Sequence, residues 1–295
     1  MHSSSPTARP SKAPTRAKPK VSSILFALGV TFVIVFCLAP ILWQVLTSFK
    51  TNSAISAVPN VYLPLLNQLT LRHYIELFTR RPFLSYMVNS AIVSALSTLL
   101  SLAIGAPAAY ALARLKLPGE QVILACILVV TLFPYILLFL GLLELVQGLR
   151  LANNYLALVV PYTTINLPLT ILVMRSFFQQ LPQDLEDAAK VDGYNTWQTL
   201  TQIVLPMTLP ALVTTGILAF IFAWNEFIFA LTFITREDLK TIPVASAQLG
   251  GASAFEIPFG PIAAATVVGT IPLVLLVLFF QKRIVQGLTA GAVKG

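Results

Sequence analysis

Charged side chains are scarce in this chain. Aspartate, glutamate, lysine and arginine make up only 10% of its 295 residues, whereas 57% are apolar and the mean hydropathy is +0.83. A soluble domain carries about 25% charged residues. The composition therefore excludes a water-soluble protein and places the chain in a membrane.

Histidine and cysteine are almost absent. His2 and His73 are the only histidines, so neither a histidine-based triad nor a histidine-rich metal site is expected. Cys37 and Cys126 both fall in apolar stretches, which excludes a disulfide framework or a thiolate cluster. No phosphate-binding G-x-x-x-x-G-K-[ST] sequence occurs. We expect no cofactor or metal bound by this chain, and no catalysis.

The basic residues exceed the acidic ones, with 19 against 11 and a net charge of +8. Such an excess is also typical of nucleic-acid binding, but five basic residues lie in positions 1–20, directly before an apolar run. A basic segment there anchors to the inner leaflet of a membrane. We expect a membrane partner, no nucleic acid, and a disordered basic cytoplasmic tail over residues 1–20, where prolines and serines are frequent.

Uncharged runs mark the expected membrane spans. An ionised side chain is costly in hydrocarbon, and a spanning helix needs about 20 apolar residues. Nothing alternates with the two-residue period of a barrel strand. The sequence predicts an all-α polytopic protein with six transmembrane helices. Five are uncharged runs and the last is interrupted only by Glu226: 21–49, 82–113, 121–143, 151–174, 257–281 and 207–234.

The basic residues also predict an orientation and a domain plan. With the N-terminus in the cytosol, 12 of the 19 basic residues lie on the inner side, and the N-terminal tail supplies the difference. The first run is too long for a cleaved signal peptide and should remain attached. We expect both termini in the cytoplasm, a membrane domain over 21–286 with a cytoplasmic loop at 179–206, and a C-terminal cytoplasmic tail over 287–295.

The inner loop carries signals for two short helices. Asp184 and Glu186 favour a helix start, and Glu186 is spaced to pair with Lys190, which predicts a helix over 183–191. Gly193 suits the left-handed position that ends it. A second helix should start at Asn195 with Gln198 as its reciprocal capping partner. It should present on one side the residues Trp197, Leu200, Ile203 and Val204.

The first of these helices carries two adjacent alanines. Leu185, Ala188 and Ala189 share one face, and small side chains let the groove of another protein approach the backbone closely. The alternative is an amphipathic helix pair lying on the lipid surface. The sequence by itself leaves both interpretations open.

The same loop resembles the EAA motif of binding-protein-dependent ABC importer permeases. The pattern is E-A-A, three residues, G, nine residues, I, one residue, L-P. The chain fits every interval but carries Asp187 where the family usually has glutamate. The matching residues, with the preceding carboxylate, are Glu186, Asp187, Ala188, Ala189, Gly193, Ile203, Leu205 and Pro206.

Other segments extend the resemblance to the maltose-type sugar permeases over residues 21–295. They are Asn89-Ser90, Ala109-Tyr110-Ala111, Phe133-Pro134, Trp224-Asn225-Glu226-Phe227 and the glycine-rich ending 287–295. The resemblance implies a type I ABC importer permease fold in a bacterial inner membrane. It also implies a second permease, an extracytoplasmic binding protein and two copies of an ATPase that holds ATP and Mg²⁺. The tail residues that it places against the ATPase are Gly287, Thr289, Gly291, Lys294 and Gly295.

The alternative function is an ion-coupled secondary sugar carrier. Such carriers usually hold several ionisable groups at mid-membrane. Here the expected spans contain only Glu226, about 28 Å along its helix from Met207, near the outer boundary. The cargo implied by the resemblance is a di- or oligosaccharide or a related glycoside, with glycerol 3-phosphate-type substrates as the alternative.

Several polar and aromatic residues in the expected spans are candidates for substrate contact. A sugar binds an aromatic face with amide and carboxylate groups at its rim. The alternative is an interfacial tryptophan and a helix–helix hydrogen bond. Tyr135 and Asn166 lie near prolines. There are two interpretations of each: it lines a pore, or it packs at a helix bend. The candidates are Tyr135, Asn166, Trp224, Asn225 and Glu226.

Overall fold

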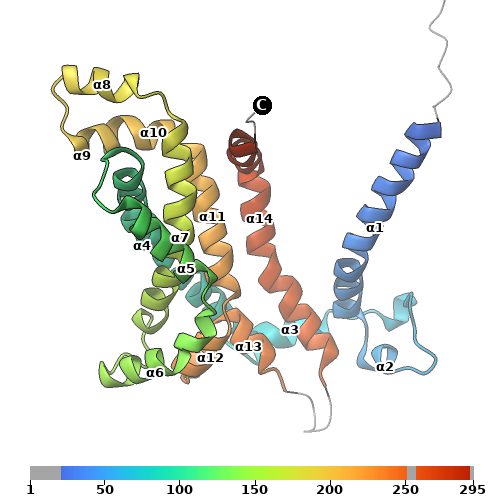
Figure 1. Cartoon of the computed structure of the whole chain (residues 1–295). Helices are drawn as coiled ribbons and strands as arrows, with labels where there is room; N and C mark the ends of the chain where they lie inside the picture. Colours follow the sequence, from blue (N-terminus) through green and yellow to red (C-terminus); the bar gives the residue numbers. More distant parts are fainter. Residues whose placement is uncertain (1–20, 251–256, 293–295) are drawn as a thin grey trace, which may run out of the picture. The chain divides into compact units, whose positions relative to one another are not determined.

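The computed structural model describes residues 21–250 and 257–292, and every regular element in that part of the chain is a helix (Figure 1). An isolated bridge pairs Lys50 with Leu69. The chain divides into two compact units, residues 1–44 and 45–295. The all-α prediction is confirmed.

The first unit contains most of α1 (Val21–Phe49). Its apolar side chains are exposed from Ile24 onward, and none of its most hydropathic stretch is buried. A helix that is apolar on all sides and uncovered by protein is suited to lipid or to the apolar surface of another subunit.

The second unit is built around α4 (Phe83–Arg114), α7 (Leu156–Gln180), α11 (Leu209–Asn225) and α14 (Phe259–Ala292). Among the described residues, four helices are long and apolar enough to span a membrane, and the number is six if each of two bent helix pairs counts as one span. The remaining elements are α2 (Asn52–Ile55), η1 (Leu66–Gln68), α3 (Arg72–Thr79), α5 (Glu120–Leu132), η2 (Tyr135–Leu138), α6 (Phe139–Gly148), α8 (Asp184–Val191), α9 (Thr196–Gln198), η3 (Thr199–Val204), α10 (Leu205–Met207), α12 (Ile228–Phe233), η4 (Glu237–Leu239) and α13 (Ile242–Ala247).

Two of the predicted continuous spans are broken. The run 121–143 bends by 88° after α5, because Pro134 has no N–H to donate and holds Phe133 in an extended conformation. The run 207–234 ends as a helix at Asn225, since Glu226 is also extended. Glu226 therefore lies in the break between α11 and α12 instead of inside one continuous helix.

The α4 and α7 helices pack closely through small and hydroxyl side chains. Ser101 Oγ donates to the Thr163 carbonyl at 3.3 Å, and Thr163 Oγ1 donates to the Ser97 carbonyl at 3.3 Å. A Cβ on Gly105 would lie 2.6 Å from Thr170 Cγ2. Small residues allow such close approach between membrane helices. The two helices therefore form one closely packed pair.

The loop between α12 and α13 is tied to α4. Asn89 on α4 donates from Nδ2 to the carbonyls of Asp238 and Lys240, both at 2.9 Å, and accepts from the Tyr155 hydroxyl at 2.7 Å. Ser90 Oγ accepts from the Ile242 N–H at 2.9 Å. The Asn89-Ser90 pair therefore anchors the end of the unit that lies away from α8.

Candidate functional site

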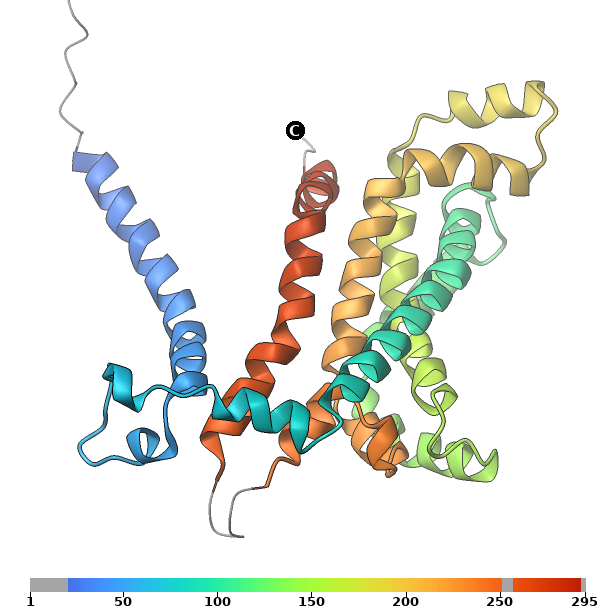
Figure 2. The ribbon, with the colours of Figure 1, turned by 180° about the vertical axis from the view of Figure 1, so that it is seen from behind.

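The predicted helical elbow is present. It comprises α8, the turn at Gly193, α9, η3 and α10, and Figures 1 and 2 show it projecting from one end of α7 and α11. The helix predicted over 183–191 is confirmed as Asp184–Val191, one residue shorter at its start. The elbow returns to the spans through an 82° bend between Met207 and Leu209.

The turn of the elbow is a Schellman motif. Gly193 has φ of +83°, its N–H donates to the Lys190 carbonyl at 3.1 Å, and the Tyr194 N–H donates to the Ala189 carbonyl at 2.9 Å. The predicted capping box is also confirmed. Asn195 and Gln198 exchange backbone-to-side-chain hydrogen bonds, both at 2.9 Å.

The second arm of the elbow contains a π-helical stretch, η3. Leu200 and Val204 are buried against α4 and α7, and Ile203 is half-buried, whereas Trp197 is exposed. The prediction that Trp197 shares one side of the helix with these residues is therefore wrong. The wider turn of a π-helix rotates the residues that precede it relative to those that follow.

The two alanines of the elbow do not share a surface. Ala188 is exposed, but Ala189 is only 1% exposed and packs inward. The expectation that both alanines line a docking face is corrected by this burial. Exposed residues of the elbow include Asp187, Ala188, Val191, Tyr194 and Trp197, and we refer to these five as its outward face.

The predicted pair between Glu186 and Lys190 is not formed. Glu186 instead forms an ion pair with Arg114 at the end of α4, with Nε and Oε1 2.9 Å apart. Lys190 pairs with Asp187 at 2.9 Å on the exposed side, and this hydrogen bond raises the pKa of Lys190. Glu186 faces inward because α4 offers a buried cation that no local spacing rule can detect.

The last motif residues lie where the elbow rejoins the spans. Leu205 is half-buried against the cluster that contains Tyr110, Met174 and Phe178. Pro206 is exposed in the first turn of α10, a position where its missing N–H costs nothing. The motif end thus positions the start of α11.

The C-terminal candidates fall partly beyond the described residues. Gly287, Thr289 and Gly291 belong to the last turns of α14, which continues as a helix to Ala292, but their burial and contacts lie outside the described set. Lys294 and Gly295 lie outside it entirely. Figures 1 and 2 show the described end of α14 on the same side of its unit as the elbow.

Three of the five candidate substrate residues are engaged within the chain. Trp224 is buried and donates from Nε1 to the Gly269 carbonyl at 3.1 Å. Asn166 is buried and donates to the Tyr162 carbonyl at 3.0 Å. Glu226 is buried, accepts from the backbone N–H groups that begin α12 at 3.0 and 3.2 Å, and also accepts from the Tyr162 hydroxyl. These contacts favour packing roles.

The other two candidates remain exposed. Tyr135 lies at the break after α5, and its ring meets Phe222 edge-on with centroids 6.0 Å apart. Asn225 is exposed at the end of α11, one helical turn from Phe222, and donates to the Ile221 carbonyl at 2.8 Å. The structure therefore leaves one accessible aromatic and one accessible amide near the same part of α11.

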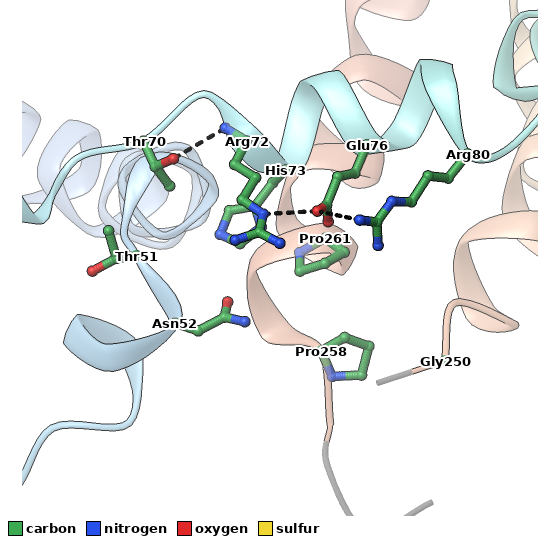
Figure 3. Close-up of a pocket in the computed structure, with 10 residues that line it drawn as sticks. All are labelled: Thr51, Asn52, Thr70, Arg72, His73, Glu76, Arg80, Gly250, Pro258 and Pro261. Atoms are coloured by element: carbon green, nitrogen blue, oxygen red, sulfur yellow. Dashed lines mark hydrogen bonds and ion pairs between the residues drawn. The ribbon is translucent and has the colours of Figure 1, made fainter. Parts of the chain in front are cut away.

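A polar cleft of about 450 Å³ lies at the end of the unit opposite the elbow (Figure 3). Glu76 pairs there with Arg72 at 2.7 Å and with Arg80 at 3.4 Å, and the hydrogen bond from Arg72 lowers the pKa of Glu76. His73 Nε2 lies 2.9 Å from the Lys50 carbonyl. No group of three potential metal ligands occurs among the described residues. The lining residues are Thr51, Asn52, Thr70, Arg72, His73, Glu76, Arg80, Gly250, Pro258 and Pro261.

Comparison with known families gives a match over residues 101–290. The matching family is described as the binding-protein-dependent transport system inner membrane component. That segment covers the elbow and all four helices of the core, except for the first part of α4.

Three curated relatives are each 40% identical to this chain. The sulfoquinovosyl glycerol transport system permease of Agrobacterium fabrum aligns over 91% of this chain and 93% of its own length. The trehalose/maltose permease of Thermococcus litoralis aligns over 92% and 97%, and the trehalose permease of Mycobacterium tuberculosis over 90% and 95%.

A solved structure shares the fold. A chain of a bacterial ABC transporter that imports the acidic polysaccharide alginate superposes with a TM-score of 0.73 at 22% identity, over 91% of this chain and 99% of that one. At this identity the likeness concerns the arrangement of helices alone.

Proposed function

The chain belongs to the family of binding-protein-dependent transport system inner membrane components, and on that premise we propose that it is the membrane subunit of an ATP-driven sugar importer. Its relatives are permease subunits and not enzymes, and the chain is likewise a transport subunit. The ATP and Mg²⁺ that drive transport belong to a separate ATPase.

The elbow is the proposed contact with that ATPase. The single observation that carries this assignment is the exposed face of Asp187, Ala188, Val191, Tyr194 and Trp197, held rigidly by a Schellman turn and a capping box. Apolar and aromatic side chains around a small residue suit a protein groove. The elbow is then cytoplasmic, and so is the end of α14.

The proposed cargo is a glycoside of two or more units. All three relatives are named for glycosides, namely sulfoquinovosyl glycerol, trehalose/maltose and trehalose. We propose a binding protein on the side of the polar cleft and a second permease that completes the pathway. Tyr135 and Asn225 are this chain's proposed sugar contacts, because an aromatic ring and a nearby amide are suited to a sugar.

Cysteine crosslinking tests the docking face. Ala188→Cys is expected to crosslink to the ATPase in the assembled complex, because Ala188 is exposed on the elbow, and Ala189→Cys is expected to give little product because that position is buried. Crosslinking is read on denaturing gels with a short bifunctional reagent. Labelling of Ala188→Cys by lipid-phase reagents alone would favour a helix pair lying on the membrane surface.

The C-terminal segment is the second proposed contact with the ATPase. Deleting residues 287–295 is expected to lower the stimulation of ATP hydrolysis by the binding protein about tenfold. The chain should still insert, because the apolar span Phe259–Lys282 is retained. The measurements are ATPase activity and membrane recovery of the purified complex. Unchanged stimulation would remove this segment from the coupling mechanism.

An ion-coupled carrier is disfavoured by the engagement of Glu226. Its carboxylate already accepts two backbone hydrogen bonds and one from the Tyr162 hydroxyl, so it is committed to beginning α12. Uptake into proteoliposomes containing this chain without an ATPase, driven by an ion gradient, would overturn the proposed function.

A further inference from the structure

One buried ion pair ties the elbow to the membrane-spanning helices. The side chains of Arg114 and Glu186 are only 7% and 12% exposed, and Nε and Oε1 are 2.9 Å apart. The Tyr110 hydroxyl, one turn earlier on α4, donates to the other Glu186 oxygen at 3.3 Å. Burying two charges has a large desolvation cost, which their mutual attraction offsets. Removing either partner would leave the other charge buried and uncompensated.

Arg114 also holds the end of α7. Its Nη2 donates to the carbonyls of Phe178 and Leu181, at 2.7 and 2.6 Å. Both carbonyls lie at the C-terminus of α7, where the helix dipole favours a cation, and the Phe178 carbonyl also accepts from the Leu181 N–H at 3.3 Å. One planar guanidinium therefore joins the last residue of α4, the last turn of α7 and the inward face of α8.

The other ion pair on α8 makes no such connection. Lys190 and Asp187 are both 68% exposed and belong to the same helix, and a pair of this kind contributes little. Among the ion pairs of the described residues, Arg114–Glu186 is the one that connects α8 to a spanning helix.

We propose that Arg114 and Glu186 are positioning residues that transmit displacement of α8 to α4 and α7 as one body. The proposal rests on the proposed function, in which an ATPase moves the elbow. Because α4 and α7 pack closely at Gly105 and Thr170, a displacement of the Arg114 guanidinium moves both helices together. Without the pair, the ATPase still binds the outward face, but its motion is absorbed between α8 and the spans.

The test is the number of sugars transported per ATP hydrolysed by the reconstituted complex. Glu186→Gln is expected to lower this ratio about tenfold while ATP hydrolysis stays within about twofold of the wild type, because the docking face is untouched. The matched control is Glu120→Gln. Glu120 forms an ion pair with Arg175 at 2.6 Å between α5 and α7, away from α8, and the ratio should change less than about twofold.

A double variant separates linkage from independent packing roles. If the two residues act as one unit, Arg114→Gln combined with Glu186→Gln should be no worse than the poorer single variant. If Glu186→Gln does not assemble, Arg114→Lys provides the second test. Lysine keeps the charge without the planar fork, and should lower the ratio while the complex still assembles.

Three results would overturn the proposal. The first is an unchanged transport ratio in Glu186→Gln, and the second is a double variant whose loss is the product of the two single losses. The third is that neither Glu186→Gln nor Arg114→Lys assembles, so that uptake and ATP hydrolysis are lost to the same extent in both variants. A wild-type complex that transports sugar without hydrolysing ATP would instead remove the proposed function itself.

Discussion

Replacing Gly193 by valine is expected to abolish sugar uptake while ATP hydrolysis by the complex continues. Gly193 has φ of +83°, and a β-branched side chain in that region costs about 1–3 kcal/mol. No atom lies within 4 Å of an added Cβ, so the effect arises from backbone strain and not from a clash. Strain opens the Schellman turn, which releases the angle between α8 and α9. We expect uptake to fall at least about tenfold.

A second left-handed glycine gives the matched control. Gly119, before α5, has φ of +76° and equally open surroundings, so Gly119→Val carries the same strain outside the elbow. It should lower the thermal unfolding temperature of the complex to a similar extent without changing sugars transported per ATP. Asparagine tolerates the left-handed region, so Gly193→Asn should recover most of the uptake. Wild-type uptake by Gly193→Val would show that the elbow angle plays no part in transport.

Replacing Gly105 by valine is expected to prevent recovery of a folded complex. An added Cβ would lie 2.6 Å from Thr170 Cγ2 and 3.2 Å from Thr170 Cβ, in the interface between α4 and α7. Overpacking of a core costs about 1–3 kcal/mol, and the Thr170 side chain is buried, which leaves it little room to move away. The measurement is the yield and thermal midpoint of the purified complex. We expect a loss of most of the yield.

A compensating change identifies the contact responsible. Thr170→Ser removes the Cγ2 methyl but keeps the hydroxyl that donates to the Asn166 carbonyl at 2.9 Å. Gly105→Ala should be destabilised alone and partly restored when combined with Thr170→Ser. Gly141→Val on α6, where nothing lies within 4 Å of an added Cβ, should leave the yield unchanged. A fully stable Gly105→Val complex would mean that α4 and α7 tolerate separation.

The structure also redefines the candidate sugar contacts. Trp224 and Asn225 are neighbours in the sequence and equal candidates there, but they differ in accessibility. Trp224 is buried against α14, whereas Asn225 is exposed. Asn89 and Ser90 were noted only as part of a resemblance, yet they anchor the loop before α13. Their contacts are made with residues far along the chain, and no local pattern predicts them.

Features that depend on neighbouring residues can be predicted from the amino-acid sequence alone. Charge-free stretches predicted the spans, Pro134 marked the site of a bend, and Gly193, Asn195 and Gln198 predicted the turn and cap of the elbow. Each of these follows from backbone geometry or desolvation within a few positions.

Helix packing, in contrast, selects which face of each helix is buried and which partner each polar group finds. Glu186 had Lys190 within local reach but pairs with Arg114, and this choice turns Ala189 inward and Ala188 outward. Glu226, expected inside a continuous span, lies just before α12, where its carboxylate accepts from two backbone N–H groups of that helix and from the Tyr162 hydroxyl. A buried charge needs an oppositely charged partner when it leaves water, and that partner is supplied by helix packing.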